Sequence, residues 1–140
     1  MKSGTQYQFP NKRVSLCHLV GMCYKYIMKI IDGTIALDDL KRMAIDGFGN
    51  MVKAVVDVER EVMAVDGELH ADEEALLLQN GSRQSNLWGI NIYPDLGMPD
   101  RIEFDSMINI RPSQGNRSRG VDDPEIREKI IQIIQKLITS

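Results

Sequence analysis

The chain has 140 residues, of which 43% are hydrophobic and 26% are charged. This length suits one domain with an ordinary core, and the proportions are those of a soluble globular protein. The net charge of −3 comes from 20 acidic and 17 basic residues, which argues against broad, nonspecific binding of nucleic acid. Two cysteines are too few for a disulfide framework, and no apolar run approaches the length of a membrane span.

The first 27 residues differ from the rest of the chain. They hold four basic residues and no acidic one, so residues 28–140 carry 13 basic against 20 acidic residues. Met28 opens a run, Lys29-Ile30-Ile31, that is typical of a protein start leading into a first strand. We therefore expect residues 1–27 to be a weakly ordered extension or a mis-assigned start, and residues 28–140 to form a single α+β domain. The segment lacks a clear secretory signal, so the expected location is the cytoplasm.

A short strand and a helix are predicted to open the domain. Residues 29–35 form the expected strand. The helix is expected to begin near Asp38 or Asp39 and to stop at Gly47, because acidic residues favour a helix start and glycine favours a helix end. The apolar residues predicted on one face of this helix are Leu37, Leu40 and Ala44.

Residues 51–58 are rich in valine and predict a strand. Alternate residues should lie on opposite sides of this strand, and Val55 on the more polar side suggests that this side is partly covered as well. A helix over residues 50–65 is the main alternative, because Glu-Arg-Glu favours helices. Residues 62–65 are interpreted as a second extended segment, followed by a turn at residues 66–67.

The segment from residue 68 to residue 79 is compatible with both an extended and a helical structure. A turn at residues 80–82 follows it, because Asn-Gly-Ser favours turns. Residues 87–93 predict a strand that ends at a hairpin loop over residues 94–101. The residues expected on the core side of this strand are Trp88, Ile90 and Ile92.

The last third of the chain is predicted as a strand, a polar loop and a helix. Apolar and polar residues alternate from residue 104 to residue 111, which indicates the strand. Residues 113–120 contain two glycines and few apolar side chains, so they form the loop. Asp122 or Asp123 is expected to cap the helix, which starts at Pro124. The apolar stripe of this helix comprises Ile126, Ile130, Ile133, Ile134 and Leu137.

These elements follow the order β-α-β-β-(β/α)-β-β-α. We therefore predict an α+β fold of two layers, in which helices pack on one face of a mostly antiparallel sheet. The sequence indicates neither an oligomeric state nor a protein partner.

The loop after the predicted strand 104–111 is rich in arginine. Arg111, Arg117 and Arg119 lie close to Asn116 and just before a helix N-terminus. Guanidinium groups and free backbone N–H groups are what an anion site needs, so the loop is predicted to bind a phosphate ligand or a nucleic-acid backbone. The alternative is that the arginines pair with acidic neighbours and hold the loop in place. The candidate acidic partners are Asp105, Asp122 and Asp123.

A second candidate site combines acidic residues with a histidine. Two runs have such residues at alternate positions: Asp57, Glu59 and Glu61 in the first, and Glu68, His70 and Asp72 in the second. Each run shares one side if its segment is extended. The predicted ligands of a divalent metal are Asp57, Glu59, Glu68, His70 and Asp72.

His70 could instead act as a general base, with Glu68 or Asp72 beside it. The nonfunctional alternative is that these acids form the solvent-facing side of an antiparallel sheet. If residues 68–72 are a turn leading into a helix, Glu68, His70 and Asp72 do not share one side.

Four stretches carry a family resemblance: residues 57–61 (Asp-Val-Glu-Arg-Glu), 67–72 (Gly-Glu-Leu-His-Ala-Asp), 87–89 (Leu-Trp-Gly) and 108–119 (Ile-Asn-Ile-Arg-Pro-Ser-Gln-Gly-Asn-Arg-Ser-Arg). They resemble a small prokaryotic family of uncharacterised proteins, a domain of unknown function. The resemblance covers about residues 28–137, and residues 1–27 have no counterpart in it. It implies no biochemical activity.

Two functions of different classes remain open. The first is a noncatalytic domain that binds a phosphate-bearing ligand or partner through the four polar residues of the arginine-rich loop. The second is a phosphoester hydrolase or nuclease, in which the acids and His70 supply a metal or a base and the same arginines hold the phosphate. A pocket shared by His70 and the loop favours the enzyme, whereas well-separated sites favour binding alone.

Overall fold

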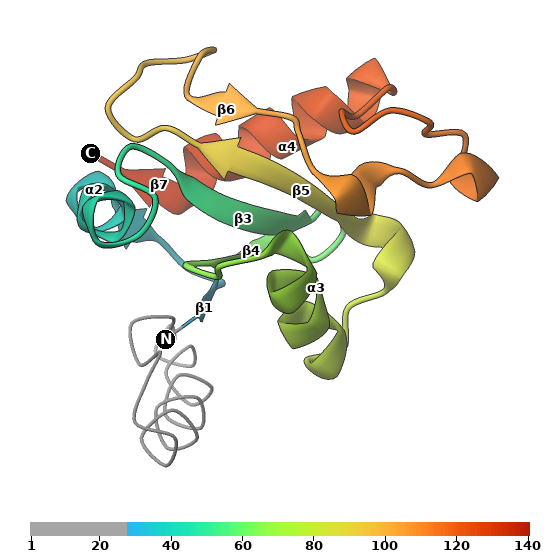
Figure 1. The fold of residues 1–140 in the computed structure, drawn as a ribbon, viewed down its shortest axis with the longest axis horizontal. Helices are drawn as coiled ribbons and strands as arrows, with labels where there is room; N and C mark the ends of the chain where they lie inside the picture. Colours follow the sequence, from blue (N-terminus) through green and yellow to red (C-terminus); the bar gives the residue numbers. More distant parts are fainter. Residues whose placement is uncertain (1–27) are drawn as a thin grey trace.

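The computed structural model describes residues 28–140, so the predictions for residues 1–27 lie outside the described residues, and the division at Met28 stays a prediction. A five-stranded antiparallel sheet lies at the centre (Figure 1). In spatial order its strands are β1 (Lys29–Ile31), β4 (Val62–Val65), β3 (Val52–Asp57), β5 (Leu87–Ile92) and β6 (Ile102–Glu103). Three helices pack against it: α2 (Leu37–Asp46), α3 (His70–Gln79) and α4 (Pro124–Leu137). The α+β class is confirmed, as are the strands predicted within residues 51–58, 62–65 and 87–93.

The helices cover both faces of the sheet, which corrects the prediction of two layers with helices on one face. On one face, α2 and α4 enclose the larger apolar cluster, to which the sheet contributes Val56 and Trp88. On the other face, α3 packs Leu76 and Leu77 against Val55. Figure 1 shows α4 above the strands and α3 below them. The central strands carry apolar side chains on both sides, and burying both sides requires a layer on each.

Helix α2 begins and ends at the predicted signals. Asp38 and Asp39 lie in its first turn, where carboxylates interact favourably with the positive end of the helix dipole. Gly47 ends the helix, and its N–H donates to carbonyls of the last turn. The buried residues of this helix are Leu40, Met43 and Ala44.

Helix α4 is confirmed with its cap and its apolar stripe. Asp123, rather than Asp122, caps it: the Asp123 side chain accepts a hydrogen bond from the Glu125 N–H at 2.9 Å. Pro124 occupies the first position. Its buried residues are Ile130, Ile133, Ile134 and Leu137. None of the helices in residues 28–140 is both long and apolar enough to cross a membrane.

Two short strands, β2 (Ile35–Ala36) and β7 (Ile138–Thr139), form a separate parallel pair. The predicted strand at residues 29–35 is therefore interrupted, because the chain bends at residues 32–33 between β1 and β2. Strand β2 leads directly into α2, and β7 directly follows α4. The pairing thus fixes the start of one helix beside the end of the other.

Helix α3 shows that the segment left open in the sequence is helical from residue 70 onward. Residues 68–72 are therefore not an extended strand. The residue before the helix, Leu69, offers no side-chain hydrogen bond to cap it. The N-terminus of α3 consequently lacks the side-chain acceptor that Ser, Thr, Asp or Asn would supply.

The prediction of a strand over residues 104–111 is wrong. Strand β6 covers only residues 102–103, and its pairing with β5 is limited to Asn91 with Glu103 and Ile92 with Ile102. Short 3-10 helices follow at Met107–Asn109 and Pro112–Gln114, and a third precedes β5 at Gln84–Asn86. The chain thus leaves the edge of the sheet two residues after joining it.

The reason is found at Gly89 on β5. The Asn109 side chain accepts a hydrogen bond from the Gly89 N–H at 2.8 Å and donates one to the Gly89 carbonyl at 3.0 Å. One amide side chain therefore takes the place of a strand partner. A Cβ on Gly89 would lie 2.6 Å from the Ser106 Cβ, so this close approach requires glycine.

Candidate functional site

One cavity of about 540 Å³ unites His70 and Arg119, which belong to the two separate regions predicted from the sequence. It lies where the N-terminus of α3 meets the ends of β3, β5 and β6 and the segment that follows β6. We call it the His70 cavity. Its polar lining residues are Lys53, His70, Asn91, Tyr93, Glu103, Asp105, Ser106 and Arg119.

A row of polar side chains crosses the sheet at the His70 cavity. Lys53 on β3 is opposite Asn91 on β5, and Asn91 is opposite Glu103 on β6, so all three share the face that α3 covers. The Asn91 amide donates to Glu103 Oε1 at 2.9 Å, and Tyr93 Oη donates to the same oxygen at 3.0 Å. Donation to Glu103 raises the pKa of Tyr93, because it stabilises the protonated phenol. Glu103 therefore binds Asn91 and Tyr93 at one end of the row, and Lys53 lies at the other end.

His70 is held in one tautomer. It is the first residue of α3, only 8% of its surface is exposed, and Nε2 lies 2.8 Å from the carbonyl oxygen of Ile90. A carbonyl only accepts, so Nε2 carries the hydrogen and Nδ1 is left with its lone pair. Burial disfavours the charged ring and lowers the pKa of His70 to about 4. The imidazole is consequently neutral at ordinary pH.

Arg119 is fixed by one carboxylate and keeps most of its donors. Its Nε lies 2.5 Å from Asp105 Oδ1, and both side chains are about half exposed. This hydrogen bond raises the pKa of Arg119 and lowers the pKa of Asp105, so both stay charged. The two terminal NH₂ groups make no hydrogen bond with residues 28–140. Arg119 therefore presents a positioned guanidinium edge at the His70 cavity.

Arg111, in contrast, is buried and serves a structural role. It is 9% exposed, and its guanidinium donates to the carbonyls of Ile108, Gln84 and Leu87. It also donates to the Gln114 side chain, so four of its five N–H groups are used inside the protein. A phosphate would have to displace these contacts, so Arg111 fixes the loop to β5.

Asn116 and Arg117 are separated from the His70 cavity as well. Asn116 is 4% exposed, donates to the carbonyls of Asn109 and Gly120, and accepts from the Asp122 N–H. The Arg117 side chain is exposed and forms no hydrogen bond or ion pair within the described part of the chain. Of the four residues predicted to bind a ligand, Arg119 alone lines this cavity.

The acids predicted as metal ligands occupy different places. Asp57 is fully buried and accepts from the backbone of Glu59 and Arg60 and from Ser82 Oγ at 2.6 Å, so it stabilises the turn after β3. Glu59 accepts from the Asn86 amide. Within residues 28–140, no three His, Cys, Asp or Glu residues lie close enough together to hold a metal ion. The acids in each run do not share one side of a strand, because the chain turns after Asp57 and residues 70–72 are helical.

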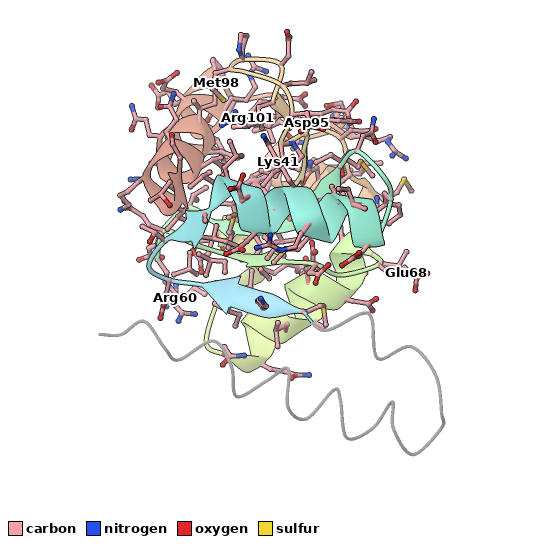
Figure 2. The ribbon with its side chains drawn as sticks, turned by 90° about the vertical axis from the view of Figure 1, so that its left-hand side faces the viewer. Lys41, Arg60, Glu68, Asp95, Met98 and Arg101 are labelled. Carbon is pink, nitrogen blue, oxygen red and sulfur yellow. The ribbon has the colours of Figure 1, made fainter. Side chains whose placement is uncertain are left out.

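The two acids predicted to assist His70 do not line its cavity. Asp72 lies in the first turn of α3, and Glu68 lines a different cavity of about 660 Å³ beside α2. Figure 2 shows Glu68 at the periphery, on the connection between β4 and α3. The carboxylates at the His70 cavity are instead Glu103 and Asp105.

The larger cavity beside α2 also contains a perturbed acid. Asp66, one of its lining residues, has its pKa raised to about 6 by burial, with nearby Lys29 opposing the shift. Next to it, the fully buried Glu73 accepts a hydrogen bond from the Gly67 N–H at 2.8 Å, and burial raises its pKa well above the ordinary value. Glu73 therefore favours the protonated form and helps to hold the β4–α3 connection.

Sequence reasoning did not identify Lys53, Asn91, Tyr93 and Glu103 as site residues. A signal was present for two of them. Lys53 interrupts a valine-rich strand, and Asn91 interrupts the apolar run of β5. Polar residues on the buried side of central strands are costly without partners, so such interruptions are informative.

The comparisons with known proteins identify a family but no characterised relative. Searches of curated proteins and of solved structures found no match. Residues 29–137 match the family described as "Protein of unknown function (DUF5674)", and this span includes every residue of the His70 cavity named above. The chain therefore belongs to the DUF5674 family.

Proposed function

We propose that the protein is a noncatalytic binding domain that holds a small phosphate-bearing anion in the His70 cavity. The observation that carries the proposal is the position of Arg119. Its Asp105 partner fixes Nε and leaves the terminal NH₂ groups available at the cavity. A guanidinium edge held in this way suits bidentate binding of phosphate oxygens.

Two further features support an anion in this place. Lys53 lines the same cavity and also the cavity beside α2, where its ammonium lies 5.1 Å from the centre of the Phe48 ring; it forms no ion pair with a carboxylate of residues 28–140. The N-terminus of α3 contributes Leu69, His70 and Ala71 to the lining and has no side-chain cap. Backbone N–H groups at a helix N-terminus favour negative charge.

Binding is favoured over phosphoester hydrolysis because His70 is a poor base in this environment. A general base is most effective when its pKa lies near the working pH, whereas the pKa of His70 is lowered to about 4. The hydrolase hypothesis also required Glu68 or Asp72 beside His70, and neither lines the His70 cavity. A neutral His70 retains a role as a hydrogen-bond acceptor.

Titration with inorganic phosphate, followed by two-dimensional NMR at constant ionic strength, tests the proposal. We expect saturable shifts of residues at the His70 cavity in the unaltered protein. Arg119→Ala should weaken binding by about tenfold or more, because it removes a charge-assisted contact.

Arg117→Ala is the matched control. It removes the same charge two residues away, from an exposed side chain outside the cavity. Equal losses in the two variants would mean that general surface charge attracts phosphate, and an absence of saturable binding in the unaltered protein would refute the proposed function.

A further inference from the structure

The geometry points to a specific form of the ligand: an oxyanion that still carries a hydrogen atom, such as hydrogen phosphate, in preference to a fully deprotonated one. This inference rests on the function proposed above and names the chemical class that the His70 cavity selects.

The lone pair on Nδ1 of His70 supports this inference. Because Nε2–H donates to the Ile90 carbonyl, Nδ1 can only accept. Nδ1 has no partner among the described residues, and it is not one of the buried polar atoms that are sealed from solvent. His70 lines the cavity, so Nδ1 is the ring nitrogen available to a ligand. A ligand atom next to it needs a hydrogen to donate.

The acids beside the cavity add further hydrogen-bond acceptors. Asp105 uses one oxygen to bind Arg119 Nε, and Glu103 uses one oxygen to accept from both Asn91 and Tyr93. The hydrogen bond from Arg119 lowers the pKa of Asp105, so this carboxylate cannot donate. Each acid retains a second oxygen that only accepts. The cavity therefore combines two cations, Lys53 and Arg119, with several acceptors.

This combination separates phosphate from sulfate. Both ions have similar size and tetrahedral shape, and both can bind the two cations. Hydrogen phosphate retains a P–OH group at neutral pH and can donate to Nδ1. Sulfate has no hydrogen, so the lone pairs of its oxygens would face the lone pair of Nδ1 and repel it. An unmatched polar group in a binding site costs one to two orders of magnitude in affinity, so we expect a preference for phosphate of about tenfold or more.

The experiment compares the dissociation constants of inorganic phosphate and sulfate for the full chain at pH 7.5 and constant ionic strength. The preference should decrease markedly in His70→Phe, which keeps a planar ring and removes the acceptor. Each preference is a ratio measured within one variant, so a general loosening of the cavity cancels. Arg119→Ala should weaken both ions and leave more of the preference in place.

A measurement on the unaltered protein avoids dependence on a variant that could fail to fold. The ¹⁵N chemical shifts of the imidazole report the tautomer and hydrogen bonding of the ring. We expect Nδ1 of His70 to be unprotonated in the free protein and to shift on addition of phosphate but not of sulfate. A protonated Nδ1, or identical responses to the two ions, would overturn the inference.

A third probe, methyl phosphate, distinguishes a free phosphate ion from a phosphate monoester. The second pKa of a phosphomonoester is about 6, so the monoester has mostly lost its last hydrogen at pH 7.5. If hydrogen phosphate is the ligand form, methyl phosphate should bind as weakly as sulfate at pH 7.5 and gain affinity at pH 5.5. His70 remains neutral at both values, because its folded pKa is about 4.

The outcomes separate the two proposals. Equal affinity for phosphate and sulfate, both dependent on Arg119, would leave the binding function standing and refute the selectivity. If neither ion binds, the proposed function and this inference both fall. A phosphate preference that persists unchanged in His70→Phe would refute the assignment of the acceptor to His70.

Discussion

The guanidinium carbon of Arg111 lies 4.3 Å from the centre of the Trp88 ring. The same guanidinium donates to three backbone carbonyls. Two of them belong to Gln84, in the 3-10 helix before β5, and to Leu87, the first residue of β5. One side chain therefore attaches the arginine-rich loop to the sheet by stacking and by hydrogen bonds at once. Arg111 thereby fixes the start of the loop, whereas Arg119 at its end is held by Asp105 and by donors to its carbonyl from Ser106 and Asn109.

Arg111→Ala is expected to lower the free energy of unfolding by about 3 kcal/mol, because it removes the cation–π contact and leaves buried carbonyls without donors. Arg111→Lys should restore little of this loss, since one ammonium cannot reach three separated carbonyls. Urea denaturation measures both effects. Arg117→Ala, an exposed change in the same loop, should stay within about 0.5 kcal/mol of the unaltered protein. A similar small effect for Arg111→Ala would contradict the structural role.

Asn109 is expected to be as important as a strand residue. Asn109→Ala would leave the Gly89 N–H and the Gly89 carbonyl without their partner and would remove one of the two donors to the Arg119 carbonyl, at a cost of about 3 kcal/mol. Asn109→Asp should not rescue stability, because it replaces the donor to two carbonyls with a second acceptor. Hydrogen exchange provides a local measurement: the Gly89 amide should exchange much faster in Asn109→Ala, which removes its acceptor, while amides at the centre of β3 change less. Unchanged protection of Gly89 would show that another group pairs with it.

His70 is expected to make stability depend on pH between about 4 and 6.5. The unfolded chain takes up a proton near pH 6.5, whereas the folded protein resists it until about pH 4. Between these values the unfolded state binds more protons, so stability falls as pH decreases through the window. The full effect corresponds to roughly 3 kcal/mol.

His70→Phe should remove this part of the pH dependence, whatever its effect on stability at pH 7.5. Urea denaturation at several pH values between 4 and 7 measures the difference in slope. Asp66 acts in the opposite direction, because its raised folded pKa of about 6 makes the folded state bind more protons than the unfolded one above pH 3.8. The comparison of slopes with and without His70 isolates the histidine, and equal slopes would refute its low pKa.

Glu61 is expected to stabilise the protein above about pH 4.5 and to lose this effect as the pH falls toward 2. It forms ion pairs with Lys129, at 2.8 Å, and with Lys136, so it connects the turn after β3 to α4. Hydrogen bonding to Lys129 is the main cause that lowers the pKa of Glu61 to about 2. A lowered folded pKa means that the unfolded state takes up the proton first as the pH decreases.

Glu61→Gln should therefore be less stable than the unaltered protein at neutral pH, and the difference should shrink between pH 4.5 and pH 2. Added salt should reduce it as well, because both lysines are partly exposed. Glu128→Gln, which removes an exposed carboxylate of α4 that forms no ion pair within residues 28–140, is the control and should change stability little. A difference that is independent of pH would assign the effect of Glu61 to something other than its charge.

The surface ion pair between Lys41 and Asp95 illustrates how helix α2 meets the loop after β5. Figure 2 shows Lys41 on α2 beneath Asp95, and the two charged groups are 3.8 Å apart. Both side chains are well exposed, so the pair contributes little stability. It belongs to the contacts that only the tertiary arrangement creates.

Elements that depend on local signals were predictable from the sequence. Helix α4 follows from the Asp123-Pro124 start and an apolar stripe at helical spacing, and β3 follows from its valines. Val55 even indicated that the second side of the sheet is covered, although the covering helix α3 was left open because residues 75–78 fit neither period. In each confirmed case, the residues that determine the element lie within it or at its ends.

The segment from residue 104 to residue 111 shows where local reasoning fails. Its alternation favours a strand, but Asn109 and Arg111 find their partners on β5 and on the turn before it. Those partners lie 20 or more residues away in the sequence. Hydrogen bonds to an open sheet edge outweighed a weak β-propensity, which is a tertiary effect.

The roles of the three arginines also depend on tertiary contacts. The sequence by itself determined that Arg111, Arg117 and Arg119 are near neighbours, and that an acidic group such as Asp105 could pair with one of them. Only the tertiary structure decided that the first is buried on Trp88, the second faces solvent, and the third joins His70 at one cavity. The physical reason is that the fate of a charged side chain depends on the desolvation and the hydrogen-bonding partners it meets, and strands distant in sequence supply both.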